Sequence, residues 1–172
     1  MSHSIQAFIA HKTVILKICE EWPDAVQLPL KQDFSLLPAS PEFVASLKDK
    51  YAQTEAVNSS VNLELTVLKL FMTEQSKKGK IVWFKTSYSG GSGFQEAFFC
   101  SNQHLEGPYR TETNWNNIKL ELVDAPKGIR AINKALYKLE VHCKYRDEFG
   151  ALELPSLNSL SLILKKIKAL KP

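Results

Sequence analysis

The segment most suggestive of chemistry is rich in glycine: residues 89–93 have the sequence Ser-Gly-Gly-Ser-Gly. Successive backbone amides in such a segment can cradle a phosphate group. A phosphate-binding loop, however, leads into a helix whose N-terminus faces the anion, and residues 94–100 have the aromatic-rich pattern of a strand. Neither the P-loop pattern nor the dinucleotide-binding pattern of glycines is present. The segment is therefore predicted to form a structural turn.

Residue spacing gives little support to nucleophilic or metal chemistry. Ser89 and Ser92 are not set in the GxSxG pattern of a nucleophile elbow. Cys100 precedes His104 by four residues, which does not define a catalytic pair. A metal site would have to gather His104, Glu106, His142 and Cys143, and no HExxH or comparable close-spaced set exists. We predict no catalytic residue, no metal ligand and no cofactor, and we expect the chain not to be an enzyme.

Two stretches that mix aromatic and polar side chains offer recognition chemistry instead. They span residues 83–88 and 109–115, and the adjacent carboxylates at 147–148 could face a basic partner. Protein interfaces favour Tyr, Trp and Arg because these side chains combine a large contact area with a polar group. Ordinary strand and loop content is the alternative explanation. The predicted partner contacts are Trp83, Lys85, Tyr88, Gln95, Tyr109, Arg110, Trp115, Asp147 and Glu148.

Composition and charge narrow the class of protein further. The 172 residues carry a net charge of +4, but the basic runs at 77–80 and 165–171 have no interleaved aromatics, so nucleic-acid binding is not expected. The three cysteines form no CxxC pair, which favours free thiols in a reducing compartment. The sequence shows no secretion signal and no apolar run of the roughly 20 residues that would span a bilayer. We therefore expect a cytoplasmic protein without membrane contact.

Hydrophobic periodicity predicts the elements of the first half. Strands are predicted over 5–9, 25–30 and 34–37, the last two as a hairpin, and helices over 12–22 and 61–73. Residues 53–60 are predicted to be a loop. Another helix should begin at Ser40-Pro41-Glu42, because serine can cap a helix, proline suits its first position and a carboxylate favours its positive end.

The second half is predicted to contain a hairpin followed by helices. Strands over 81–88 and 94–100 flank the glycine turn, whose residues can take positive φ. A further strand is predicted over 118–123 and a helix over 128–141, whereas 109–117 could not be assigned. Residues 147–150 should start a short turn or helix, and the last helix should begin at Pro155.

The order of these elements predicts an α+β fold in a single domain spanning residues 1–172. Strands and helices are interspersed without regular alternation, which argues against a doubly wound parallel sheet. We expect a mixed or antiparallel sheet that includes the glycine-turn hairpin and is packed by about four to five helices.

Several short motifs in the second half resemble those of a group of small, uncharacterised bacterial proteins. The matching features are a GGxGxQ turn at Gly90, Gly91, Gly93 and Gln95, an INxAL helix at 132–136 and a DEF turn at 147–149. The C-terminus departs from that group, which usually closes with Arg, Thr and Trp. Such proteins are associated with polymorphic toxin systems as immunity proteins.

The resemblance implies a binding protein that neutralises a cognate bacterial toxin by direct protein–protein contact. Its partner would be a protein toxin or effector domain, covered by a complementary surface. The alternative is a small hydrolase or transferase with a site near the glycine turn.

Overall fold

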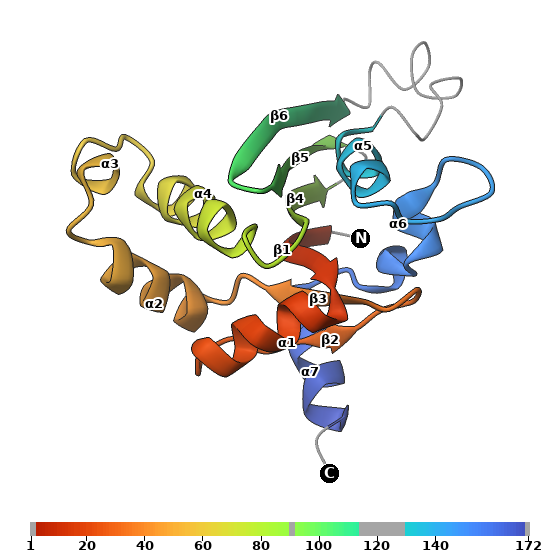
Figure 1. Ribbon diagram of the computed structural model, residues 1–172. Coiled ribbons are helices and arrows are strands. Elements are labelled where there is room, and N and C mark those ends of the chain that lie inside the picture. The colour runs from red at the N-terminus through yellow and green to blue at the C-terminus, as the bar shows by residue number, and fades with distance from the viewer. Residues whose placement is uncertain (1–2, 90–91, 114–129, 171–172) are drawn as a thin grey trace.

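A single six-stranded antiparallel sheet organises the molecule, with strand order β2-β3-β1-β4-β5-β6 (Figure 1). The computed structural model describes residues 3–89, 92–113 and 130–170. The strands are β1 (His3–His11), β2 (Leu28–Pro29), β3 (Phe34–Pro38), β4 (Ile81–Ser89), β5 (Ser92–Ser101) and β6 (His104–Thr113). The α-helices are α1 (Lys12–Glu21), α2 (Pro41–Tyr51), α3 (Glu55–Asn58), α4 (Leu63–Gln75), α5 (Ala131–Lys138), α6 (Glu148–Ala151) and α7 (Leu160–Leu170), with a 3₁₀ turn at Leu154–Ser156.

Strand β1 lies at the middle of the sheet and pairs with both β3 and β4. Because successive side chains of a strand point to opposite faces, β1 contributes to two separate cores. Phe8 lies on one face, between Leu37 and Trp83 of the neighbouring strands. Ile9 lies on the other face, between Leu36 and Val82.

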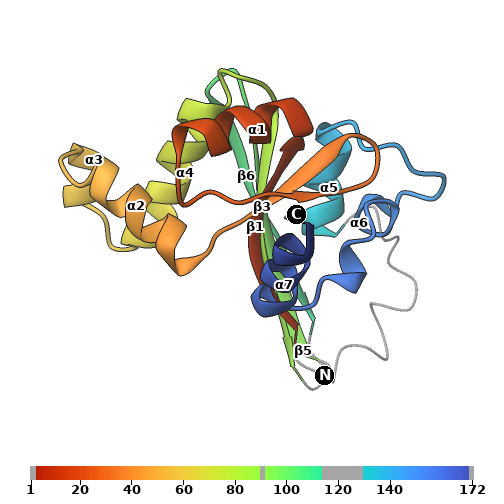
Figure 2. The ribbon, with the colours of Figure 1, turned by 90° about the horizontal axis from the view of Figure 1, so that it is seen from below.

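The first face of the sheet is covered by α1, α2 and α4, which lie together on one side in Figure 2. An aromatic cluster fills the space beneath them: Phe71 of α4 contacts Phe8, Trp22 and Phe43 edge-on, with ring centroids 5.0, 5.7 and 5.3 Å away. Edge-to-face contacts at this spacing are the preferred arrangement of aromatic pairs.

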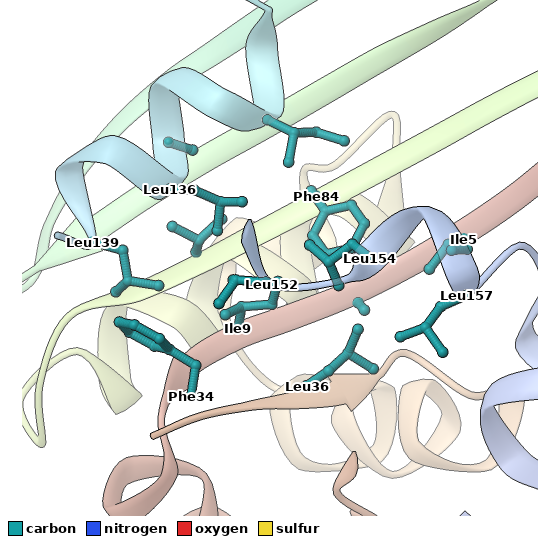
Figure 3. Packing of buried hydrophobic residues seen from close by; sticks show 14 of the residues in the cluster. Ile5, Ile9, Phe34, Leu36, Phe84, Leu136, Leu139, Leu152, Leu154 and Leu157 are labelled. Atoms are coloured by element: carbon teal, nitrogen blue, oxygen red, sulfur yellow. The ribbon is translucent and has the colours of Figure 1, made fainter. Parts of the chain in front are cut away.

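The second face is covered by α5, α6 and α7, on the opposite side of the sheet in Figure 2. Figure 3 shows Phe84 of β4 and Ile9 of β1 facing Leu136 of α5 and Leu154 of the 3₁₀ turn. Both helical layers share the same sheet, so the described residues form one domain of the predicted α+β class with an antiparallel sheet.

Local sequence signals account for most of the helix boundaries. The Ser40 hydroxyl accepts a hydrogen bond from the Phe43 amide, and Pro41 occupies the first turn of α2, as predicted. The Asp147 carboxylate caps α6 by accepting from the Gly150 amide. The last helix starts later than predicted, because residues 154–156 form the 3₁₀ turn and the Ser159 hydroxyl accepts from the Leu162 amide.

Other expectations differ from the structure or lie outside its described part. The predicted loop at 53–60 contains the single helical turn α3, and the unassigned segment near 109 belongs to β6. Strands β4 and β5 pair antiparallel up to Ser89 and Ser92, whereas Gly90 and Gly91 lie outside the described residues, as does the strand predicted over 118–123. None of the described helices is long and apolar enough to cross a membrane.

Candidate functional site

The predicted partner contacts are divided between the two faces of the sheet. The alternation of β4 sends Trp83 and Lys85 toward α4, whereas Tyr88 lies on the side of α5 and α6. Gln95 of β5 also lies on the α5 side. The structure therefore does not bring the aromatic-polar stretch of residues 83–88 together as one surface. Trp115 lies outside the described residues.

On the α4 side, the sheet and the start of α4 border a shallow cleft of about 220 Å³. Trp83, which lines it, is only 2% exposed, and its indole nitrogen is buried without a hydrogen-bond partner among the described residues. Lys85 lies beside Glu96, and Glu96 in turn forms a 3.1 Å ion pair with Arg110 of β6. Of these predicted contacts, the exposed Arg110 and the half-buried Lys85 are accessible, whereas the Trp83 ring is a core side chain.

On the opposite side, Tyr88, Gln95 and Asp147 line one pocket of about 290 Å³ between the ends of β4 and β5, the start of α5 and α6. The fold thus brings together three predicted contacts from three different elements or segments, whereas Trp83 and Lys85 in the other cleft come from one strand. Phe149 contributes an apolar wall to the same pocket. The α5 side of the sheet is therefore the candidate functional site.

A buried asparagine joins α5 to the segment that carries Asp147. Asn133 is 3% exposed, and its Oδ1 accepts a 2.8 Å hydrogen bond from the Phe149 amide. Its Nδ2 lies 3.5 Å from the carbonyl oxygen of Arg146. These contacts hold residues 146–149 against the helix. The sequence contains a signal for this buried polar residue, because Asn133 adjoins the apolar stripe of Ile132 and Leu136.

The same segment displays an arginine between a buried carboxylate and an exposed ring. Glu148 is fully buried, and its Oε1 accepts a 3.0 Å hydrogen bond from Nε of Arg146. The Arg146 guanidinium lies 3.9 Å from the centroid of the Tyr137 ring, a cation–π contact. Nearby along the chain, Lys144 Nζ lies 5.3 Å from the centroid of the Tyr145 ring. Tyr137, Lys144, Tyr145 and Arg146 are named the Tyr–Arg surface below.

The exposure of its two aromatic rings sets the Tyr–Arg surface apart. Tyr137 is 55% exposed and Tyr145 is 76% exposed, which is unusual for large aromatic side chains. Arg146 has φ of 54°, in the left-handed region, and it shares this conformation with six other described residues that are not glycine. Sequence reasoning missed Tyr137, Tyr145 and Arg146, although it selected their buried neighbour Glu148.

Tyr109, another predicted contact, belongs to a polar cluster at the far end of α5. Its hydroxyl donates a 3.1 Å hydrogen bond to Glu106 Oε2, which also forms a 2.6 Å ion pair with Lys138. The hydrogen bond from Lys138 lowers the pKa of Glu106. Burial, assisted by the hydrogen bond to Glu106, raises the pKa of Tyr109, so its hydroxyl stays protonated at neutral pH. The cluster fastens the last turn of α5 to β6.

Metal-binding geometry was not found in the described part of the chain, where no group of three or more His, Cys, Asp or Glu side chains converges. The three cysteines are free thiols, and burial raises the pKa of Cys19.

Comparisons of the chain with protein-family models, with curated proteins and with solved structures gave no match.

Proposed function

We propose that this chain is an immunity-type binding protein that neutralises a cognate bacterial toxin by direct protein–protein contact, with the Tyr–Arg surface as part of that contact. The observation that supports the proposal is the arrangement around Arg146. A fully buried carboxylate holds this arginine against an exposed tyrosine ring. Tyrosine and arginine are the side chains enriched at the energetic centres of protein interfaces.

The geometry of Arg146 favours tight binding because it is set before a partner arrives. Association normally costs about 0.5–1.5 kcal/mol for each rotamer-rich side chain that becomes ordered. The Arg146 side chain is already fixed by its bond to Glu148 and by the Tyr137 ring. Its guanidinium keeps further N–H groups for a carboxylate or carbonyl group of the partner. This surface therefore suits a partner that presents acceptor groups.

The experiment co-expresses the chain in a bacterial host with the product of the neighbouring gene, and measures growth and complex formation. The native chain should restore growth and co-purify with that product. The double variant Tyr137→Ala/Tyr145→Ala should weaken the complex by at least about 30-fold, the loss expected for a hot-spot residue. Both rings are exposed, so their truncation should leave the fold intact.

The matched control is Leu16→Ala/Lys17→Ala, which removes an exposed apolar side chain and a cation from α1 on the opposite helical layer. This variant should bind and protect as the native chain does. If the native chain neither binds the neighbouring product nor restores growth, the proposed function is overturned. If it protects equally well without Tyr137 and Tyr145, the function stands and the assignment of the surface is wrong.

A further inference from the structure

The pocket between β4, β5 and the start of α5 contains two polar side chains, each with a buried atom that has no hydrogen-bond partner among the described residues. These are Gln95 of β5 and Arg130, which occupies the N-cap position of α5 without a capping hydrogen bond from its side chain. Thr86 lies opposite Gln95 in the β4–β5 ladder and lines the same pocket. This site lies beside the Tyr–Arg surface, but its residues are different.

Gln95 is the first of the two unused groups. The side chain is 8% exposed, and its Oε1 is buried without a hydrogen-bond partner among the described residues. Leaving a buried side-chain amide oxygen unpaired costs about 1–3 kcal/mol, and the large majority of buried side-chain polar atoms in folded proteins have a partner. The exceptions call for an explanation, and one is a ligand that supplies the missing donor.

Arg130 is the second unused group. Among the described residues, its buried Nε has no hydrogen-bond partner and no carboxylate forms an ion pair with it. A partly buried guanidinium is ordinarily paired, because desolvation of a charge is costly. The planar fork of arginine matches the two oxygens of a carboxylate. Among the described residues, the pocket thus holds a cation without an anion and an amide oxygen without a donor.

We propose that this pocket binds a small molecule that carries one carboxylate and, next to it, a hydroxyl or amino group. The carboxylate pairs with Arg130, and the neighbouring donor bonds to Gln95. The hydroxyl of Thr86 adds a third polar contact, and the Phe149 ring with Pro155 provides an apolar wall for the rest of the ligand. A volume of about 290 Å³ limits the ligand to the size of an amino acid or a hydroxy acid.

Phosphate fits the same surroundings poorly. The first amide of α5, on Ala131, already donates a 2.8 Å hydrogen bond to Thr111 Oγ1 and is not turned to an anion. The carboxylate of Asp147 also lines the pocket and repels a dianion. Phosphate sites at helix N-termini depend on several free backbone amides and a favourable dipole. A carboxylate with a single negative charge can pair with Arg130, and a hydroxyl or amino group next to it can donate to Gln95. The negative charge of Asp147 attracts such a donor.

The test uses the full native chain and a matched series of ligands in nuclear magnetic resonance titrations. The probes are 3-phenyllactate, phenylalanine, 3-phenylpropionate and inorganic phosphate, each raised to about 10 mM so that a millimolar dissociation constant is exceeded tenfold. The signals followed are the Nε–H of Arg130 and the side-chain amide of Gln95. Phenyllactate or phenylalanine should shift both signals and bind at least about tenfold more tightly than phenylpropionate, which lacks the donor.

Two variants separate recognition from a structural role. Arg130→Gln should weaken binding of phenyllactate at least about tenfold, because the charged hydrogen bonds are lost. Gln95→Leu should remove the preference for phenyllactate over phenylpropionate, and it should not lower the melting temperature, since the buried oxygen has no described partner to lose. The control Arg110→Gln, on the other face of the sheet, should leave binding unchanged.

The inference is overturned if neither phenyllactate nor phenylalanine shifts the two signals, if phosphate binds more tightly than either, or if both variants bind like the native chain. These outcomes are independent of toxin neutralisation, because they are measured on the isolated chain.

Discussion

The guanidinium of Arg146 lies 3.9 Å from the centroid of the Tyr137 ring while its Nε donates to the fully buried Glu148 at 3.0 Å. One side chain therefore links the interior of the α5–α6 layer to its surface. Glu148 has a second oxygen, Oε2, that is buried without a partner among the described residues. Among the described residues, Arg146 is thus the main group that compensates the buried carboxylate of Glu148. The same hydrogen bond fixes the position of Arg146 from the interior of the protein.

The first prediction follows from this dependence. Arg146→Ala should lower the free energy of unfolding by about 2 kcal/mol, because it leaves the carboxylate of Glu148 buried and unpaired. Glu148→Gln should cost less than Arg146→Ala, since the exposed arginine can turn to water and the amide carries no charge. The measurement is urea unfolding followed by circular dichroism.

The double variant Arg146→Ala/Glu148→Gln supplies the control for that prediction. If the cost of Arg146→Ala arises from a stranded charge, the double variant should be more stable than Arg146→Ala alone. Additive losses would show that Glu148 and Arg146 stabilise the protein independently, and would contradict the role given to the buried carboxylate.

The second prediction concerns Gly93, at the start of β5. A Cβ atom at this position would lie 2.1 Å from the carbonyl oxygen of Ser87 and 2.8 Å from Cα of Tyr88. Both atoms belong to the backbone of β4 and cannot move without disturbing the ladder. Gly93→Ala should therefore destabilise the protein by about 1–3 kcal/mol, the usual cost of overpacking. The measurement is thermal unfolding of Gly93→Ala, with Ser89→Ala as the control. Ser89 lies at the same end of the hairpin and its side chain is exposed.

Much of the fold could be predicted because local signals and packing agree. The stripe of Phe43, Val44, Leu47 and Tyr51 follows the Ser40 cap, and all four side chains are buried as α2 packs on the sheet. Strand β6 could not be predicted in the same way. Its residue Arg110 pairs with Glu96 across the ladder. Of the described side chains of this strand, only Leu105 and Tyr109 pack against the cores, so it shows no regular apolar alternation.

The candidate site could be predicted only in part, for reasons of geometry. Trp83 and Tyr88 belong to one aromatic-polar stretch, but Tyr88 is the fifth residue after Trp83 along β4, and an odd step along a pleated strand places the two side chains on opposite faces. Tyr137 falls outside the apolar stripe of α5, which is consistent with exposure but does not reveal a function. The contact of Arg146 with Tyr137 arises from the conformation of the α5–α6 connection, for which the sequence carries no periodic signal.

The third prediction tests the aromatic cluster of the α4 layer. Phe71 is fully buried and its ring contacts three other aromatic rings. Phe71→Ala should lower the free energy of unfolding by about 3–5 kcal/mol, because apolar burial and edge-to-face contacts are lost and a cavity remains. Leu16→Ala on α1, where the side chain is 43% exposed, should change stability by less than about 0.5 kcal/mol. Equal effects in chemical denaturation would contradict the packing described.

The fourth prediction concerns pH and the cluster in which Glu74 of α4 accepts hydrogen bonds from two residues of α2. Lys50 Nζ lies 2.7 Å from Glu74 Oε1, and the Tyr51 hydroxyl donates to Oε2 at 2.5 Å. Partial burial acts to raise the pKa of Glu74, but the hydrogen bonds from Lys50 and Tyr51 outweigh it and bring the pKa below its usual value of 4.5. Burial and the bond to Glu74 raise the pKa of Tyr51, so this donor stays protonated.

The sign of the pH effect follows from the lowered pKa. A carboxylate whose pKa is lower in the folded state binds fewer protons there, so its stabilising contribution is complete above the unfolded-state pKa and is lost as the pH falls through the folded-state pKa. The native chain should therefore lose more stability than Glu74→Gln between about pH 5 and pH 3. Urea unfolding midpoints across this range measure the difference. Parallel pH profiles for the two proteins would show that the contacts between α2 and α4 through Glu74 do not depend on its charge.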